Sequence, residues 1–269
     1  MITREPPPFA PPRNVLQRLG QSCLRGLGEI GRATGIALGA FAAMRHALSR
    51  RSRAEIVQQM YTGGIKSLPV VTVVAFFIGM ILALQIGIEL RKFNQEAYVG
   101  PAVMATMLRE MGPFMSGLVL AACVGAAMAA QLGTMTINEE IAALEIMSID
   151  PIRFLVMPRM VAMVVMVPTL SFYTCMMGVL GGAVVCHTQL AVPWAAYFQN
   201  ALDFAGVRAL YVGLFKALVF GILITTVACY EGFSTKHGAV GVGIATRRCV
   251  VSCFLLILIT GYFVTRLFY

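Results

Sequence analysis

The stretch Leu68–Ile88, LPVVTVVAFFIGMILALQIGI, contains no charged residue. An apolar run of about 20 residues is long enough to cross the hydrocarbon core of a bilayer as a helix. Four further apolar runs of similar or greater length follow along the chain: Ala102–Gly133, Phe154–Cys186, Val207–Cys229 and Cys249–Tyr269. We therefore predict an all-α integral membrane protein with five transmembrane helices.

The composition agrees with this prediction. Of 269 residues, 58% are hydrophobic and only 12% are charged, whereas a soluble domain is about half apolar and about a quarter charged. A soluble enzyme and a nucleic-acid-binding module are thereby excluded. The net charge of +9 comes largely from the N-terminal region, since nine of the 21 Lys and Arg residues precede residue 54.

The distribution of positive charge predicts the orientation. Cytoplasmic loops carry an excess of Lys and Arg. With the N-terminus inside, fifteen of the 21 basic residues lie on the cytoplasmic side and four on the outer side. We therefore expect a cytoplasmic N-terminus and an outer C-terminus. The second and third spans exceed the required length and contain Pro113 and Pro168, so we expect each to be one helix that kinks, tilts or projects into water.

The chain divides into three parts. Residues 1–12 are rich in proline and are expected to be disordered. Residues 13–60 form a cytoplasmic interfacial helical region, whose first helix carries Arg18, Arg25 and Arg32 opposite an apolar stripe. Such a helix is typical of one lying on a membrane surface, although a solvated helix packed on a partner remains the alternative. Residues 61–269 form the transmembrane domain.

Small residues recur at every fourth position of the second and fourth spans and allow helices to approach closely. They are Gly117, Ala121, Gly125, Ala129 and Gly133, then Gly213, Ala217 and Gly221. Packing within the bundle and packing between subunits both fit this pattern.

Charged residues inside a bilayer are costly and mark functional candidates. Arg109 and Glu110 lie near the outer end of the second span, Lys216 lies within the fourth, and Glu89 closes the first. We expect these residues to hold a lipid headgroup, with the cations binding its phosphate. The alternative is a structural ion pair between Arg109 and a carboxylate of a neighbouring helix.

The loop between the second and third spans predicts a short acidic helix over residues 137–149. Thr136–Glu139 has the form of a capping box that begins a helix, and Asp150–Pro151 should end it. Ile137, Ile141, Leu144 and Ser148 would share one side. The negative charges are Glu139, Glu140, Glu145 and Asp150. This pattern favours docking into a groove on a soluble partner, with a surface helix against the membrane as the alternative.

Motifs for catalysis are missing from the sequence. It has no nucleophile elbow, no zinc-protease motif and no P-loop, so we predict a non-catalytic chain without a cofactor or metal of its own. Energy must then come from a gradient or from a second protein. A gradient-driven carrier or channel is the alternative function, and an intramembrane lipid enzyme ranks third.

One segment resembles the signature of a known family. The motif Leu108–Pro113, with the sequence LREMGP, is followed by Gly133, Met135, Glu139, Ala143-Leu144, Met147, Asp150-Pro151 and Pro158-Arg159. Together these residues resemble MlaE-type permeases, and the resemblance extends over roughly residues 55 to 269.

The resemblance implies a permease subunit of an ABC transporter that moves phospholipids between the inner and outer membranes of bacteria. It implies a homodimer in the inner membrane, with a periplasmic C-terminus and a lipid pocket at the dimer interface. Partners would be an MlaF-like ATPase holding ATP and magnesium, an MlaD-like MCE-domain protein and, in some systems, an MlaB-like STAS-domain protein. The loop helix would be the coupling helix, contacting the ATPase through Glu139, Glu140, Leu144, Glu145, Met147 and Asp150.

The chain departs from the family pattern at three positions. Cys123 stands where the family usually has Arg, Gln131 where it usually has Glu, and Glu140 where Gln is common. Opposite charges at 123 and 131 are lost together, so apolar packing is expected to replace an ion pair.

Overall fold

The computed structural model describes residues 15–43, 50–190, 192–203, 206–236 and 238–268. These residues form helices and connecting turns, without a strand among them. Five segments are long and apolar enough to cross a membrane: Arg53–Arg91, Glu96–Ile137, Ile152–Gln189, Val207–Phe233 and Gly238–Phe268. The predicted all-α membrane fold with five spans is confirmed. The expected disordered tail over residues 1–12 lies outside the described residues.

The spans are built from several helices. In the first span, α2 (Arg50–Gly63) meets α3 (Leu68–Arg91) at a short 3-10 turn. The second comprises α4 (Val99–Thr106), α5 (Gly112–Leu120) and α6 (Ala126–Ile137). The remaining helices are α1 (Val15–Ala43), α7 (Glu140–Ile146), α8 (Met157–Gln189), α9 (Trp194–Asp203), α10 (Val207–Phe233) and α11 (Gly238–Phe268).

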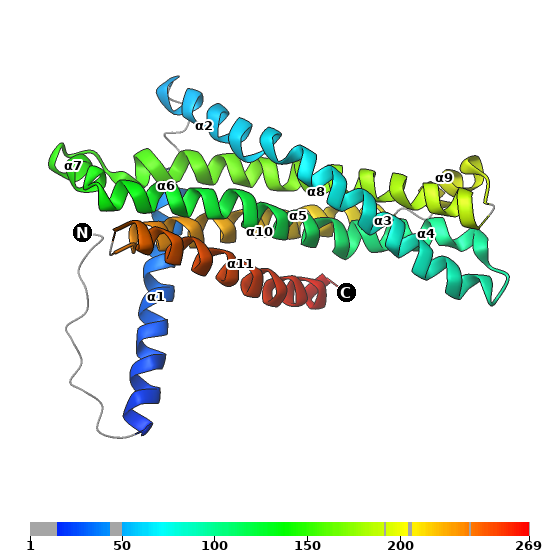
Figure 1. Ribbon diagram of the computed structural model, residues 1–269, viewed down its shortest axis with the longest axis horizontal. Coiled ribbons are helices and arrows are strands. Elements are labelled where there is room, and N and C mark those ends of the chain that lie inside the picture. Colours follow the sequence, from blue (N-terminus) through cyan, green and yellow to red (C-terminus); the bar gives the residue numbers. More distant parts are fainter. Residues whose placement is uncertain (1–14, 44–49, 191, 204–205, 237, 269) are drawn as a thin grey trace.

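The helices form an elongated bundle with α7 at one end and α9 at the other (Figure 1). The most apolar part of α10 is 67% buried, whereas that of α11 is 17% buried. Thus α10 lies at the centre of the bundle, and α11 exposes much of its apolar surface, as a lipid-facing helix does.

Glycines permit the closest helix contacts. A Cβ atom on Gly79 of α3 would collide with the backbone of Gly178 on α8. The small-residue stripe of the second span is buried in the same way: Gly117 and Gly125 face Phe220 and Ile224 of α10. The stripe therefore packs within the bundle, which is one of the two possibilities left open by the sequence.

The second span is irregular at two places. Two π-helical turns, Met107–Met111 and Ala121–Gly125, interrupt it. Pro113 is the second residue after the first turn, whereas Pro168 lies inside the uninterrupted α8. Turns of this kind often occur at functional positions in helices.

The N-terminal helix α1 stands roughly perpendicular to the bundle, and its N-terminal part projects away from it (Figure 1). Its last turns are attached to the bundle, because Ile36 and Ala40 are buried in a cluster with Leu155 and Met160. Its placement on a membrane surface stays a prediction. The expected boundary between residues 60 and 61 lies within α2, which continues to Gly63.

Candidate functional site

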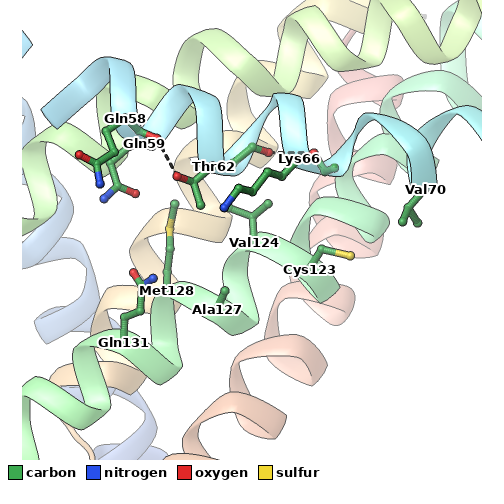
Figure 2. A pocket seen from close by; sticks show the side chains of 12 residues that line it. Gln58, Gln59, Thr62, Lys66, Val70, Cys123, Val124, Ala127, Met128 and Gln131 are labelled. Atoms are coloured by element: carbon green, nitrogen blue, oxygen red, sulfur yellow. Dashed lines mark hydrogen bonds between the residues drawn. The ribbon is translucent and has the colours of Figure 1, made fainter. Parts of the chain in front are cut away.

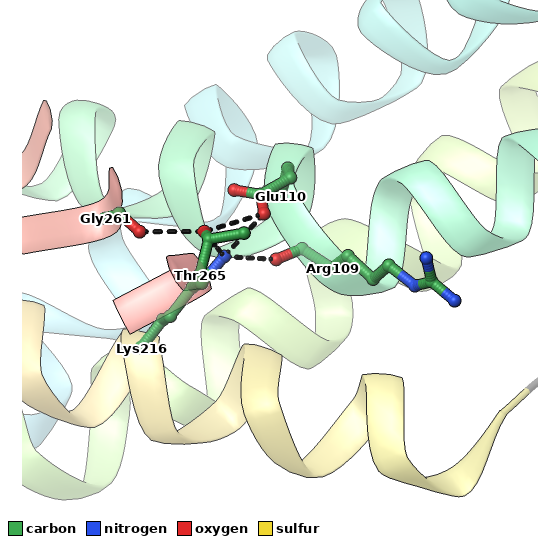
Figure 3. Close-up of polar contacts among 5 residues, drawn as sticks. All are labelled: Arg109, Glu110, Lys216, Gly261 and Thr265. Atoms are coloured by element: carbon green, nitrogen blue, oxygen red, sulfur yellow. Dashed lines mark hydrogen bonds and ion pairs between the residues drawn. The ribbon is translucent and has the colours of Figure 1, made fainter. Parts of the chain in front are cut away.

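Lys216 is the centre of a polar cluster inside the bundle. Its side chain is only 1% exposed. The Nζ atom donates to Glu110 Oε1 at 2.7 Å, to Thr265 Oγ1 at 2.7 Å and to the carbonyl oxygen of Arg109 at 2.9 Å (Figure 3). An ammonium group has three hydrogens, so these three acceptors satisfy it completely.

The acceptor on Arg109 arises from the sequence of the second span. In an α-helix the carbonyl of residue 109 would accept from the N–H of residue 113, but Pro113 has no N–H. A buried carbonyl without a donor is costly. Lys216 supplies that donor from another helix, and it therefore stabilises the π-helical turn that carries Arg109 and Glu110.

Gly213 lets α10 approach this turn. A Cβ atom at position 213 would collide with the carbonyl oxygen of Leu108. Lys216 lies three residues further along the same helix, within reach of the next carbonyl of the turn. A small residue in α10 thus places the buried ammonium group against the irregular part of the second span.

The structure brings together only some of the predicted headgroup residues. Glu110 and Lys216 form an ion pair, and Glu110 retains a side-chain exposure of 42%. The Arg109 side chain is exposed and points away from Lys216 (Figure 3). Glu89 pairs with Lys92 at 2.9 Å at the exposed end of α3. The carboxylate of Glu110 therefore pairs with Lys216, whereas the sequence had suggested Arg109 for a structural pair.

Sequence reasoning missed Thr265 of α11. Its hydroxyl accepts from Lys216 and lies 2.9 Å from Glu110 Oε1 and 2.8 Å from the carbonyl oxygen of Gly261. A hydroxyl has one proton, so these two oxygens compete for it. A threonine in an apolar helix commonly bonds to the backbone carbonyl of the preceding turn. The sequence around Thr265 therefore did not indicate a contact with Lys216.

The prediction that Thr136–Glu139 forms a capping box for the loop helix is wrong. Thr136 belongs to the last turn of α6. Its hydroxyl lies 2.8 Å from the carbonyl oxygen of Leu132 and 3.1 Å from that of Gly232, and its one proton goes to these acceptors instead of capping a new helix. Glu139 occupies the left-handed region with φ of 59° and makes no side-chain cap. The reason is that α6 continues to Ile137. The Thr136 hydroxyl therefore bonds within the last turn of α6.

The loop helix is also shorter than predicted, because α7 covers only Glu140–Ile146. Ser148 adopts a φ of 60° beyond its end, so it does not share a helical face with Ile141. The Oδ1 atom of Asp150 accepts from the N–H of Ile152 at 3.0 Å. Asp150 thus lies at the start of the following helix instead of ending α7.

The outer surface of α7 is both acidic and apolar. Ile141 and Leu144 pack against the bundle, whereas Ile146 and Met147 are 84% and 61% exposed. The four carboxylates around them are exposed as well: Glu139, Glu140, Glu145 and Asp150. Large exposed apolar side chains beside charges are typical of an interaction surface.

Five apolar helical spans and a buried, fully bonded lysine define an all-α integral membrane protein of the multi-pass class. The family model described as Permease MlaE matches residues 56–267. The chain belongs to the MlaE permease family.

Individual relatives agree with this assignment. A probable ABC transporter permease protein of Rickettsia conorii is 39% identical over 80% of this chain and 83% of its own. A protein of the same description from Synechocystis is 32% identical over 82% and 84%. The intermembrane phospholipid transport system permease protein MlaE of Haemophilus influenzae is 29% identical over 95% of this chain and 98% of its own.

Proposed function

We propose that this chain is the permease subunit of an ABC transporter that moves phospholipids between the inner and outer membranes. The observation that carries the proposal is the family match over residues 56–267, which includes all five spans' apolar cores and α7. The Haemophilus relative, which is similar over nearly its whole length, is named as a phospholipid transport permease.

In this proposal α7 is the coupling helix. A separate MlaF-like ATPase, which binds ATP and magnesium, contacts its outer surface through Glu139, Glu140, Glu145, Met147 and Asp150. Leu144 packs against the bundle, so its part is to hold α7 in place. Force from the ATPase would reach the bundle through the short connections of α7 to α6 and α8.

The headgroup region is the π-helical turn of the second span. Lys216 has all three hydrogens bound within the protein, so its role is to fix the turn. The exposed Arg109 side chain and the half-exposed Glu110 carboxylate then meet the lipid headgroup. Glu89, exposed at the end of α3, contributes charge to the same outer region.

The proposed assembly is a homodimer in the bacterial inner membrane, with the N-terminus cytoplasmic and the C-terminus periplasmic. An MlaD-like MCE-domain protein would receive the lipid on the outer side, and an MlaB-like STAS-domain protein would attend the ATPase. With this orientation the α7 end of the bundle is cytoplasmic.

Native mass spectrometry of the tagged chain, extracted gently from its own cells, tests the proposal. We expect two copies with two ATPase subunits and bound phospholipid. A species without ATPase or lipid, reproduced in several mild detergents, would contradict the proposal and favour a gradient-driven carrier.

A further inference from the structure

A pocket of about 410 Å³ opens between the first and second spans, in the half of the bundle that carries α7. Its walls come from α2 and the start of α3 on one side and from the second π-helical turn and α6 on the other (Figure 2). It is separate from the Lys216 cluster, because none of the cluster residues lines it.

The pocket carries one formal charge. Lys66 is the only charged residue among those that line it. In the described part of the chain, no carboxylate lies within 4 Å of its Nζ atom. The Nζ atom lies 5.9 Å from the ring centroid of Tyr61, an arrangement that leaves hydrogens for a ligand. The site is therefore suited to an anion.

Polarity changes along the pocket. Gln58, Gln59 and Gln131 lie toward the α7 end, and Val70 and Cys123 lie at the opposite end (Figure 2). The apolar surface continues beyond the pocket, since Val73 and Phe77 of α3 are each 57% exposed. A polar region beside a cation, followed by an apolar surface, matches an anionic amphiphile rather than a small hydrophilic ion.

The neutral side chains at the second span favour the same ligand. Cys123 and Gln131 both line this pocket, and neither carries a charge. A glutamate at position 131 would repel a phosphate group, whereas the amide of Gln131 can donate to one. With both side chains neutral, Lys66 determines the sign of the ligand.

We propose that this pocket binds an anionic phospholipid from the leaflet on the α7 side of the membrane. Its phosphate pairs with Lys66, its headgroup hydroxyls bond to the glutamine amides, and its acyl chain follows Val70 and the exposed face of α3. The inference rests on the proposed phospholipid transport and adds a second lipid site to it. With the proposed orientation, this site takes lipid from the cytoplasmic leaflet.

Binding of phosphatidylglycerol to the purified full chain, followed by native mass spectrometry, tests the site. Lys66→Gln removes the cation, and Ala127→Phe fills the pocket. Matched controls are Arg247→Gln, an exposed cation outside the pocket, and Ala122→Phe, an exposed alanine of the same span outside the pocket. Inorganic phosphate is added as a competitor in a parallel series.

We expect Lys66→Gln to weaken binding of one phosphatidylglycerol about fivefold, the effect of one Lys near an anionic lipid surface. Ala127→Phe should abolish it, and both controls should bind as the wild type does. Equal lipid binding by Lys66→Gln and Arg247→Gln would overturn the inference even if Ala127→Phe fails to fold. Displacement of the lipid by inorganic phosphate would assign the pocket to a free anion and overturn the inference. A change of subunit number in Ala127→Phe would assign the pocket to a subunit contact and overturn it as well.

The outcome separates this inference from the proposed function. Wild-type protein that binds no phospholipid contradicts both. Lipid loss in Arg109→Gln without loss in Lys66→Gln contradicts the second site alone.

Discussion

Lys216 Nζ and Glu110 Oε1 lie 2.7 Å apart across two spans, and the two side chains differ sharply in burial, at 1% and 42% exposure. The ammonium depends on this partner and on two neutral oxygens, whereas the carboxylate also reaches the surface. The pair is therefore asymmetric, and the two halves should respond differently to substitution.

Removing the carboxylate should cost more than removing the ammonium. Glu110→Gln leaves a buried charge without its counter-ion, and we expect a loss of about 2–3 kcal/mol, below the value for a fully buried pair because Glu110 is partly exposed. Lys216→Met removes the donor to the Arg109 carbonyl, but it leaves no buried charge, because the Glu110 carboxylate is 42% exposed; it should therefore cost less. Thermal unfolding in detergent, with the double variant completing the cycle, measures the coupling. A coupling energy near zero would refute the structural role of the pair.

Arg109 should affect lipid rather than stability. Its side chain is exposed and lies away from Lys216, so Arg109→Gln should lower bound phospholipid while the unfolding temperature stays close to that of the wild type. Native mass spectrometry and thermal unfolding of the same samples give both readouts. Unchanged lipid occupancy would assign the headgroup to other residues.

Gly213 should be intolerant of any side chain. Gly213→Ala places a Cβ against the carbonyl oxygen of Leu108, which separates α10 from the π-helical turn and weakens the Lys216 cluster. Overpacking of this kind costs about 1–3 kcal/mol. Gly243→Ala is the matched control, because its Cβ would meet nothing within 4 Å. Equal stability of the two variants in thermal unfolding would refute the close contact.

Charge reversal on α7 should break the association with the ATPase. Glu139→Lys and Glu140→Lys place positive charge on an exposed acidic surface, far from the bundle core, so the membrane fold should persist. Glu139→Gly separates charge from geometry, since glycine fits the φ of 59° at this position without strain. Co-purification of the ATPase with each variant is the measurement. Asp203→Lys at the α9 end serves as the control, and undiminished co-purification of the α7 variants would reject the coupling role.

Tyr197 should make stability depend on alkaline pH. Its hydroxyl donates to the carbonyl oxygen of Val179 on α8 at 3.2 Å, and burial raises the pKa of Tyr197 above its ordinary value of 10.0, with a smaller contribution from Cys186. The folded protein thus retains a proton that the unfolded chain loses. The associated stability is complete below about pH 10 and declines as pH rises toward the folded pKa. Thermal unfolding against pH should show a shallower alkaline decline for Tyr197→Phe than for the wild type.

Composition and periodicity were enough to predict the five spans and their order. An apolar run long enough for a bilayer is a property of one segment, and it does not depend on which helix lies beside it. The same holds for the presence of Arg109, Glu110 and Lys216 within spans and for an acidic segment before Asp150. A motif whose role depends on the preceding helix was predicted wrongly from its spacing alone. Thr136 has the spacing of a helix cap, but α6 continues through it.

Tertiary structure decided which of these groups meet. The missing N–H of Pro113 is visible in the sequence, but the donor that replaces it comes from α10, and Thr265 reaches the same point from α11. Likewise, Lys66 and Gln131 line one pocket although 65 positions separate them in the chain. Such contacts depend on how each helix is rotated and where it crosses the next, and close glycine contacts such as Gly79 with Gly178 set those crossings. Hydropathy determines that a segment enters the membrane, whereas only packing between segments determines which polar atoms satisfy one another there.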